Sequence, residues 1–215
     1  MGVQFKTRTS DNSIIGLWEI TETVDQLTEL LGQTNLQIIE EEVTTLCDFK
    51  SEKRKCELLA SRLLLSDMLG RTAHIRYDSH GKPHLVEPKL SISISHKFDL
   101  VIILLTPKKH AGIDIEFISE KIATVALKFL NPAEFENIDT QNKIFHLYIH
   151  WCAKEVLYKI YGKRNLRFKE NLTIAPFEPK PEGNLVGFIK NDHVDEEYLL
   201  RYFTFGDYVV VWGVK

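Results

Sequence analysis

The sequence predicts an α+β fold built from two similar halves, each with one long helix against a mainly antiparallel sheet. Two observations support the helices: residues 51–69 and about 141–161 are helical in pattern, and a glycine follows each stretch. Strand-like segments surround both helices along the chain. The length of 215 residues suits one large domain or two small fused ones. We therefore expect an N-terminal half at 1–106 and a C-terminal half at 107–215.

The first half begins with a strand and a short helix, then continues with the long helix and four strands. The short helix is expected to begin near Asp25, and the long one is expected to be capped by Asp48 or Ser51. Residues 90–95 (LSISIS) alternate strictly, as half-buried strands do. The expected elements are a strand at 13–20, helices at 24–33 and 51–69, and strands at 73–77, 83–86, 90–95 and 99–106.

The second half contains one strand, then helices, then closing strands. Ser119 is the expected cap of a helix over 119–130, and Asn131 followed by Pro132 is typical of a helix start. The other expected elements are a strand at 111–117, a helix at 141–161 and strands at 185–190, 197–204 and 208–214. No sequence repeat relates the halves, so a pseudo-two-fold relation is inferred from element order alone. A groove between the halves is then the expected ligand site.

Composition and charge indicate an ordinary globular protein of the cytoplasm. The net charge of −3 gives no overall electrostatic reason to bind nucleic acid or membranes. No apolar run is long enough to span a bilayer, and the N-terminus lacks a signal-peptide pattern. Cys47, Cys56 and Cys152 lack metal-ligand spacing, so we expect free thiols.

The segment HAGIDIEF (110–117) places two acids on one side of a predicted strand. Alternate residues of a strand share a face, so Asp114 and Glu116 project together while Ile113 and Ile115 face the core. Two close carboxylates repel unless a cation lies between them, and Mg²⁺ prefers such oxygen ligands. From spacing alone, a solvent-facing edge strand with two surface acids is the simpler interpretation.

A second pattern lies on the helix that contains HWCAKEVLYKIYGK (150–163). Trp151, Glu155, Tyr158 and Lys159 fall near one face, because residues three or four apart are neighbours on a helix. Glu155 and Lys159 form an i,i+4 pair with the glutamate first. Taken alone, this pair is equally well explained as a surface ion pair.

Together the two patterns resemble the signature motifs of the 4′-phosphopantetheinyl transferases. GIDIE (112–116) is similar to G-[IV]-D-[IV]-E, and WCAKEVLYK (151–159) is similar to W-[ST]-x-K-E-[AS]-x-x-K. Cys152 and Val156 depart from the second motif, at positions expected to pack in the core. The resemblance covers roughly residues 50–177. Its other parts are the basic helix with Lys53, Arg54 and Arg62, the turn Gly81-Lys82-Pro83, the strand end Ser93-Ile94-Ser95-His96, and the segment at 165–177.

The resemblance implies an enzyme that moves the phosphopantetheine arm of coenzyme A to a serine of an acyl or peptidyl carrier protein, releasing 3′,5′-ADP. It implies Mg²⁺ held by Asp114, Glu116 and Glu155, with Glu155 and Lys159 as catalytic residues. The chain length resembles the monomeric type that activates surfactin synthetase. The coenzyme A ligands implied by the resemblance are Arg54, Arg62, Lys82, Ser95, His96 and Lys154, and the candidate carrier-docking cations are Lys143, Lys163, Arg164, Arg167 and Lys169.

Two other functions are compatible with the same residues. A non-catalytic module that binds coenzyme A or a carrier protein would share the fold but modify nothing. A metal-dependent nucleotide hydrolase would release 3′,5′-ADP without a carrier present. Both remain open from the sequence.

Overall fold

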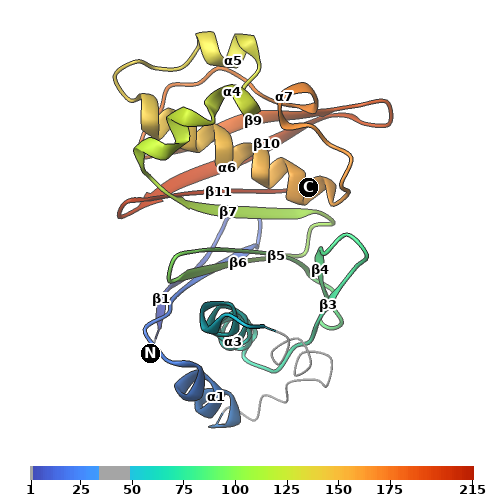
Figure 1. The fold of residues 1–215 in the computed structure, drawn as a ribbon. Helices are drawn as coiled ribbons and strands as arrows, with labels where there is room; N and C mark the ends of the chain where they lie inside the picture. The colour runs from blue at the N-terminus through green and yellow to red at the C-terminus, as the bar shows by residue number, and fades with distance from the viewer. Residues whose placement is uncertain (1, 34–48) are drawn as a thin grey trace. The chain divides into compact units, whose positions relative to one another are not determined.

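A computed structural model describes residues 2–33 and 49–215 of the chain (Figure 1). Contacts divide the chain into two units, residues 1–107 and residues 108–215, and each is described here by itself. Cys47 and the expected cap Asp48 lie outside the described residues. The expected fold class is confirmed, because each unit contains a long helix and an antiparallel sheet.

The first unit has a four-stranded antiparallel sheet in the order β1-β2-β6-β5. A separate hairpin is formed by β3 and β4. Strand β1 was not predicted from the sequence. It lies largely exposed at the edge of the sheet, and its polar residues gave no apolar pattern that would mark a strand. The elements are β1 (Val3–Arg8), β2 (Ile14–Glu19), α1 (Val24–Gln33), α3 (Glu52–Leu69), β3 (Ile75–Tyr77), β4 (Pro83–Leu85), β5 (Ser91–Lys97) and β6 (Leu100–Thr106).

Helix α3 carries the core of this unit and packs against β2, β6 and α1. It ends at Gly70, whose φ of 66° lets its N–H reach the carbonyl of Ser66. Helix α1 is capped differently from the expectation. Thr23 and Gln26 exchange side-chain-to-backbone hydrogen bonds, so this pair rather than Asp25 begins the helix.

The second unit has a five-stranded antiparallel sheet in the order β7-β11-β10-β9-β8, with α6 packed on β7 and β11. Helix α6 ends at Gly162 as predicted. The elements are β7 (Ala111–Phe117), the 3₁₀ helix η1 (Glu120–Thr124), α4 (Ala126–Phe129), α5 (Pro132–Glu136), α6 (Lys143–Tyr161), α7 (Phe168–Asn171), β8 (Leu172–Ile174), β9 (Glu182–Lys190), β10 (Asp195–Phe205) and β11 (Tyr208–Val214).

The single helix expected over 119–130 is wrong. The structure has η1 and α4 in its place, separated at Val125. The Thr124 hydroxyl donates to the carbonyl of Lys121, which competes with regular helical bonding. The Val125 N–H then bonds to the carbonyl of Ile122, three residues back. Helix periodicity did not reveal this local competition.

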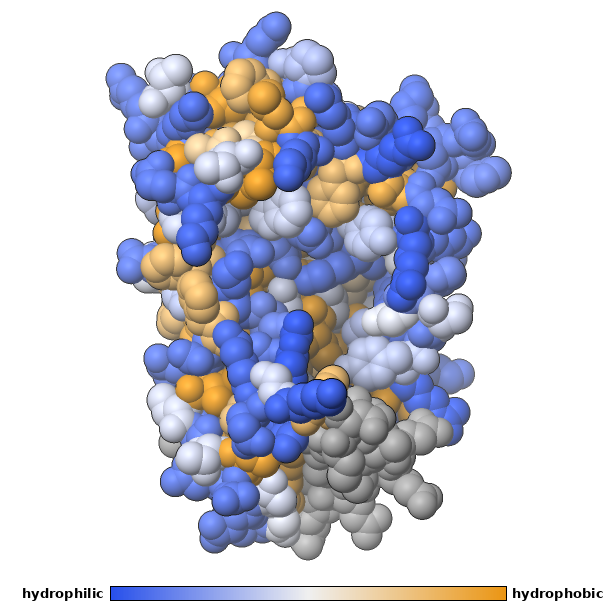
Figure 2. Space-filling view, viewed as in Figure 1, coloured by the Kyte–Doolittle hydropathy of each residue, from blue (hydrophilic) through white to orange (hydrophobic). Residues whose placement is uncertain are grey.

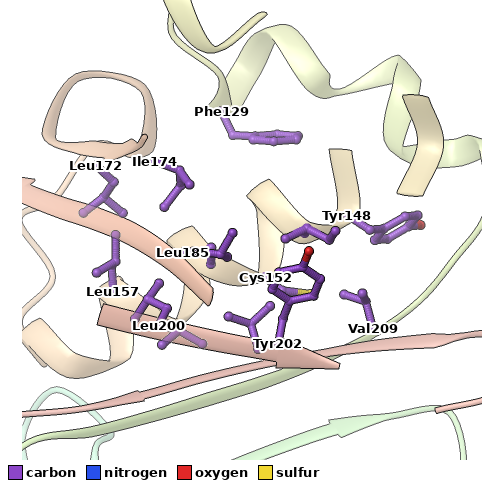
Figure 3. Packing of buried hydrophobic residues seen from close by; sticks show 14 of the residues in the cluster. Phe129, Tyr148, Cys152, Leu157, Leu172, Ile174, Leu185, Leu200, Tyr202 and Val209 are labelled. Carbon is purple, nitrogen blue, oxygen red and sulfur yellow. The ribbon is translucent and has the colours of Figure 1, made fainter. Parts of the chain in front are cut away.

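The core of the second unit lies between α6 and the sheet. Figure 3 shows Cys152 and Leu157 of α6 among side chains of the strands, including Leu185, Leu200 and Val209. Cys152 and Val156, the two departures from the helix motif, are each 0% exposed. They occupy packing positions, as predicted.

Gly112 allows β7 and α6 to approach closely. A Cβ atom at this position would lie 2.5 Å from the carbonyl oxygen of Val156, which is backbone and cannot move aside locally. We expect Gly112→Ala to lower the free energy of unfolding by about 1–3 kcal/mol. Urea unfolding would measure it. Gly32→Ala is the control, because a Cβ there meets nothing within 4 Å, and alanine in α1 should stabilise. An equal effect of both substitutions would contradict the packing argument.

Two buried histidines lie beside Phe177 in the second unit. The rings of His146 and His150 are 5.0 Å apart, and Phe177 packs against both. The pKa of His150 is lowered to about 3, first by burial and then by the charges of His146 and Lys154. A carboxylate oxygen of Glu134 lies 3.9 Å from Nδ1 of His150, but that carboxylate is already paired with Lys154. Burial therefore dominates, and the folded protein keeps His150 neutral.

This burial predicts acid sensitivity. The pKa of His150 is about 3 in the folded protein, below the usual value of 6.5. Between these values the unfolded chain binds a proton that the folded chain excludes, so stability falls as the pH drops below 6.5. The expected loss from His150 is about 2 kcal/mol at pH 5. His150→Leu should reduce the difference in unfolding free energy between pH 7.5 and pH 5. An unchanged difference would contradict this assignment.

The visible surface in Figure 2 is largely hydrophilic, with hydrophobic residues in scattered patches. None of the helices among the described residues is both long enough and apolar enough to cross a membrane.

Candidate functional site

The two acids of β7 face helix α6. Gly112, Asp114 and Glu116 alternate along the strand, and the Cα of Gly112 is turned toward Val156 of α6. Asp114 is 6% exposed, so it is no surface acid. Ile113 and Ile115 are buried on the other face, with exposures of 0% and 1%. Strand β7 does lie at the edge of its sheet, but the interpretation as two solvent-facing acids fails for Asp114, which is buried.

Glu155 brings a third carboxyl group to this place from α6. Its pKa is raised to about 7, first by burial and then by the charge of Asp114, with Lys159 opposing and Glu116 adding to the rise. The charges of Asp114 and Glu116 on β7 therefore act on Glu155 of α6, the helix that packs on this strand.

Lys159 and Trp151 hold the two strand acids in place. The Lys159 ammonium donates to Oδ1 of Asp114 at 2.9 Å and to the carbonyl of Ile113 at 2.7 Å. The Trp151 indole N–H donates to Oε1 of Glu116 at 3.4 Å. Lys159 therefore pairs with Asp114, and its charge also lowers the pKa of Glu155. The thiol of Cys152 lies beside Asp114, and burial raises its pKa well above the usual range.

The chemistry of these donors suits a hard divalent cation. The charges of Asp114 and Glu116 raise the pKa of Glu155, so a cation near these carboxyl groups would be favourable. Within residues 2–33 and 49–215, no group of three or more His, Cys, Asp or Glu side chains has a metal-ligating arrangement. That result is consistent with the ion pair of Lys159 and Asp114, in which the ammonium group balances the negative charge of the Asp114 carboxylate.

The first unit contains a pocket of about 230 Å³ between α3, the β3–β4 hairpin and β5. His96 and Arg54 meet at its wall, with 2.6 Å between Nε2 and Nη1. The buried carboxylate of Glu57 contacts both, at 3.1 Å from Arg54 and 3.3 Å from His96. The lining residues are Phe49, Arg54, Glu57, Leu58, Ser61, Tyr77, Gly81, Pro83, Ile94, His96 and Val101.

Comparison with known proteins shows which family the second half of the chain resembles. A family model described as the 4′-phosphopantetheinyl transferase superfamily matches residues 110–211, which include the three acids and Lys159. Curated relatives named 4′-phosphopantetheinyl transferase are also similar to the chain. The matched segment is thus similar to the 4′-phosphopantetheinyl transferase superfamily.

Relatives extend the similarity beyond the matched segment. A 4′-phosphopantetheinyl transferase of Bacillus subtilis is 27% identical over 190 residues, which cover 74% of this chain and 84% of the relative. The 4′-phosphopantetheinyl transferase HetI of a Nostoc strain is 24% identical over 203 residues, 83% of this chain and 84% of the relative. The 4′-phosphopantetheinyl transferase AcpT of Escherichia coli K12 is 29% identical over 115 residues, 51% of this chain and 59% of the relative.

Lys154 of the superfamily's helix motif is placed differently from the expectation. It is 0% exposed, and its ammonium donates to Glu134, to the carbonyl of Phe129 and to the carbonyl of Phe168 at 2.7, 2.7 and 3.0 Å. These three bonds use all its N–H groups. We therefore do not carry Lys154 forward as a ligand of coenzyme A.

Glu134 was missed by sequence reasoning. Its two oxygens accept from Lys154, from the backbone N–H of Asn131 and from the backbone N–H of Ile174. The side chain of Asn131 accepts from the Glu134 N–H in return, which completes a capping box on α5. The spacing of Asn131 and Glu134 is the signal that could have revealed half of this network.

The other residues expected to bind coenzyme A differ in position. Arg54 and His96 line the pocket of the first unit, whereas Arg62, Ser95 and Lys82 are not among its lining residues. Arg62 is buried at 5% exposure and donates to the hydroxyl of Ser61, so it is not part of a solvated basic face. Burial lowers the pKa of Lys82, whose neighbours Gly81 and Pro83 do line the pocket.

Proposed function

We propose that this protein transfers the 4′-phosphopantetheine arm of coenzyme A to a serine of an apo carrier protein and releases 3′,5′-ADP, with Mg²⁺ required. The relatives' shared name supports the transfer and its enzyme class. We also propose a monomeric cytoplasmic enzyme of the surfactin-synthetase-activating type, because one chain supplies two helix-and-sheet units.

The observation that supports this proposal is the packing of α6 on β7, which pairs Lys159 with Asp114 and exposes Glu155 to the charges of Asp114 and Glu116. A strand and a helix well separated in the sequence supply these four groups. A binding module would not need a buried Asp114 with half-buried Glu116 and Glu155, because burying carboxylates costs stability.

Asp114, Glu116 and Glu155 would hold the magnesium ion. Bound there, the ion would supply positive charge that stabilises the pyrophosphate as its bond breaks. Trp151 orients Glu116 through its indole N–H, and Lys159 orients Asp114.

Glu155 is proposed to accept the proton of the carrier serine. The serine oxygen bonds to the phosphorus that bears the pantetheine arm, and the bond from that phosphorus to the bridging oxygen breaks. The electron pair leaves with 3′,5′-ADP. A base with a pKa near 7 suits proton removal at neutral pH. Lys159 adds positive charge next to Asp114 and so opposes the accumulation of negative charge during the step.

The pocket of the first unit is proposed to bind part of coenzyme A. Its walls include Leu58, Ile94 and Tyr77, which suit a flat base, and Arg54 and His96, which suit a phosphate group. Glu57 contacts both side chains and keeps them at the pocket wall.

The test is incubation with coenzyme A, MgCl₂ and a panel of apo acyl and peptidyl carrier proteins, followed by mass spectrometry of each carrier. A mass gain of one phosphopantetheine arm, prevented by EDTA, is expected. Binding of coenzyme A without modification of any carrier would support the non-catalytic module. Release of 3′,5′-ADP without a carrier would support the hydrolase.

A further inference from the structure

Two phenylalanine rings pack against the indole of Trp151, the residue that donates to Glu116. Phe168 stacks on the indole, with ring centroids 5.5 Å apart and ring planes at 30°. Phe129 packs edge-on against it, at 5.2 Å and 67°. One ring comes from α7 and the other from α4, so two separate segments restrict the rotation of one side chain. We call Phe129 and Phe168 the aromatic clamp.

The backbone of both clamp residues is held by one ammonium group. Lys154 donates to the carbonyl of Phe129 at 2.7 Å and to the carbonyl of Phe168 at 3.0 Å. Its third bond goes to Glu134 at 2.7 Å, and the Lys154 side chain is fully buried. Helices α4 and α7 have four residues each, too few to be stable without tertiary contacts. The position of the aromatic clamp therefore depends on Lys154.

Stability alone does not account for a lysine at this place. A buried ion pair can often be replaced by apolar residues of similar volume without a loss of stability. An apolar side chain could not reproduce the three directed bonds, which fix two segments against α6. Trp151 precedes Lys154 by three residues on that helix, so the two are neighbours. The same turn of α6 thus carries the indole and the group that fixes the rings around it.

We propose that Lys154 is a positioning residue for Glu116, acting through the aromatic clamp and the indole N–H of Trp151. This inference rests on the proposed function, in which Glu116 is a ligand of Mg²⁺. The indole N–H donates to Oε1 of Glu116 at 3.4 Å. Loss of such an outer partner of a metal ligand typically lowers metal affinity or activity about 10- to 100-fold. In this role Lys154 contributes to metal binding without contacting coenzyme A.

Phe168→Leu tests the clamp without removing a bond of Lys154, because the acceptor at this position is the backbone carbonyl. The Mg²⁺ concentration that gives half-maximal transfer should rise about tenfold, whereas kcat at saturating Mg²⁺ should stay within about threefold. Binding of Mn²⁺, which also prefers oxygen ligands, is a second readout that needs no carrier. Measured with coenzyme A present, from the EPR signal of the free ion, it should weaken by the same factor.

Phe177→Leu is the matched control for this substitution. Phe177 is half-buried, as Phe168 is, and it packs against the same helix at His146 and His150. The control loses a ring of the same size from the same unit but leaves the clamp intact. It should change neither the Mg²⁺ requirement nor the binding of Mn²⁺.

A double-mutant cycle with Trp151→Phe separates positioning from a general loss of structure. This substitution keeps an aromatic ring in the clamp but removes the N–H that bonds to Glu116. It should weaken Mn²⁺ binding about tenfold by itself. Phe168→Leu should then weaken the binding no further, because its effect passes through the missing N–H. Additive losses would overturn the inference.

Lys154 itself is tested in a background without the opposing charge. Lys154→Met with Glu134→Gln should bind Mn²⁺ about tenfold more weakly than Glu134→Gln alone, because only the double variant loses the bonds to both clamp carbonyls. Its KM for coenzyme A should stay within about twofold. Circular dichroism at the assay temperature would check that both variants are folded.

Two results would overturn the inference while leaving the proposed function intact. One is unchanged Mn²⁺ binding in Phe168→Leu and in the variant that combines Lys154→Met with Glu134→Gln. The other is a raised KM for coenzyme A with unchanged Mn²⁺ binding, which would assign Lys154 to that substrate. A wild-type protein that modifies no carrier, or that modifies one in the presence of EDTA, would instead contradict the proposed function.

Discussion

Replacing Glu155 by Gln is expected to abolish detectable transfer of phosphopantetheine while the protein stays folded. The substitution removes the proposed proton acceptor and one of three carboxylates for the cation. Loss of a general base alone typically slows a reaction about 10²- to 10⁴-fold. Mass spectrometry of the carrier in single-turnover conditions would measure the loss.

Stability distinguishes lost chemistry from lost structure in this variant. Burial and acidic neighbours raise the pKa of Glu155 to about 7. Above pH 7 its carboxyl group is ionised in surroundings that disfavour the charge, and this lowers the stability of the folded protein. Glu155→Gln should therefore unfold at the same or a higher temperature at pH 8. Glu178→Gln is the control, because Glu178 has a side chain that is 88% exposed. Near wild-type turnover by Glu155→Gln would remove Glu155 from the mechanism.

Replacing Lys154 by Met is expected to destabilise the second unit by about 3–5 kcal/mol, because it leaves the Glu134 carboxylate buried without its partner. Both side chains are almost fully buried, at 0% and 2% exposure. The carbonyl groups of Phe129 and Phe168 would also lose their donor. Urea unfolding at pH 7.5 would measure the change.

The double variant tests whether the ion pair is the cause. Lys154→Met with Glu134→Gln removes the isolated charge and keeps one acceptor oxygen, for the N–H of Asn131 or of Ile174, which bond to different oxygens of Glu134. It should be more stable than Lys154→Met alone. A Lys154→Met protein with normal stability and a raised KM for coenzyme A would instead restore the role that the family resemblance implied.

The positions of the acids proposed for catalysis could be predicted because each group follows from a local pattern. Alternation along residues 111–117 places Asp114 and Glu116 on one face, and helical spacing places Glu155 near Lys159. One further fact was needed, which is that the helix packs on that face of the strand. Gly112 makes this contact possible, and it lies within the motif itself.

The sequence was less informative where a side chain depends on a distant partner. Lys154 looked like a phosphate ligand, yet its partner Glu134 comes from a short helix 20 residues earlier. Arg62 was expected to bind coenzyme A, yet it is buried, and the run of leucines around it obscured which face α3 buries. Local periodicity cannot show which of two equally charged residues on a helix faces the core.

The placement of Cys152 has a consequence for handling a thiol substrate. Coenzyme A ends in a sulfhydryl group, and a reactive cysteine next to the acids could attack its oxidised disulfide form, giving a mixed disulfide and one released coenzyme A thiolate. Attack requires a thiolate, and the thiol of Cys152 is 0% exposed with a pKa held well above its usual range by burial and by Asp114. Oxidised coenzyme A should therefore leave this cysteine unmodified. Oxidation of the proposed substrate by oxygen would then not lead to modification of the enzyme at Cys152.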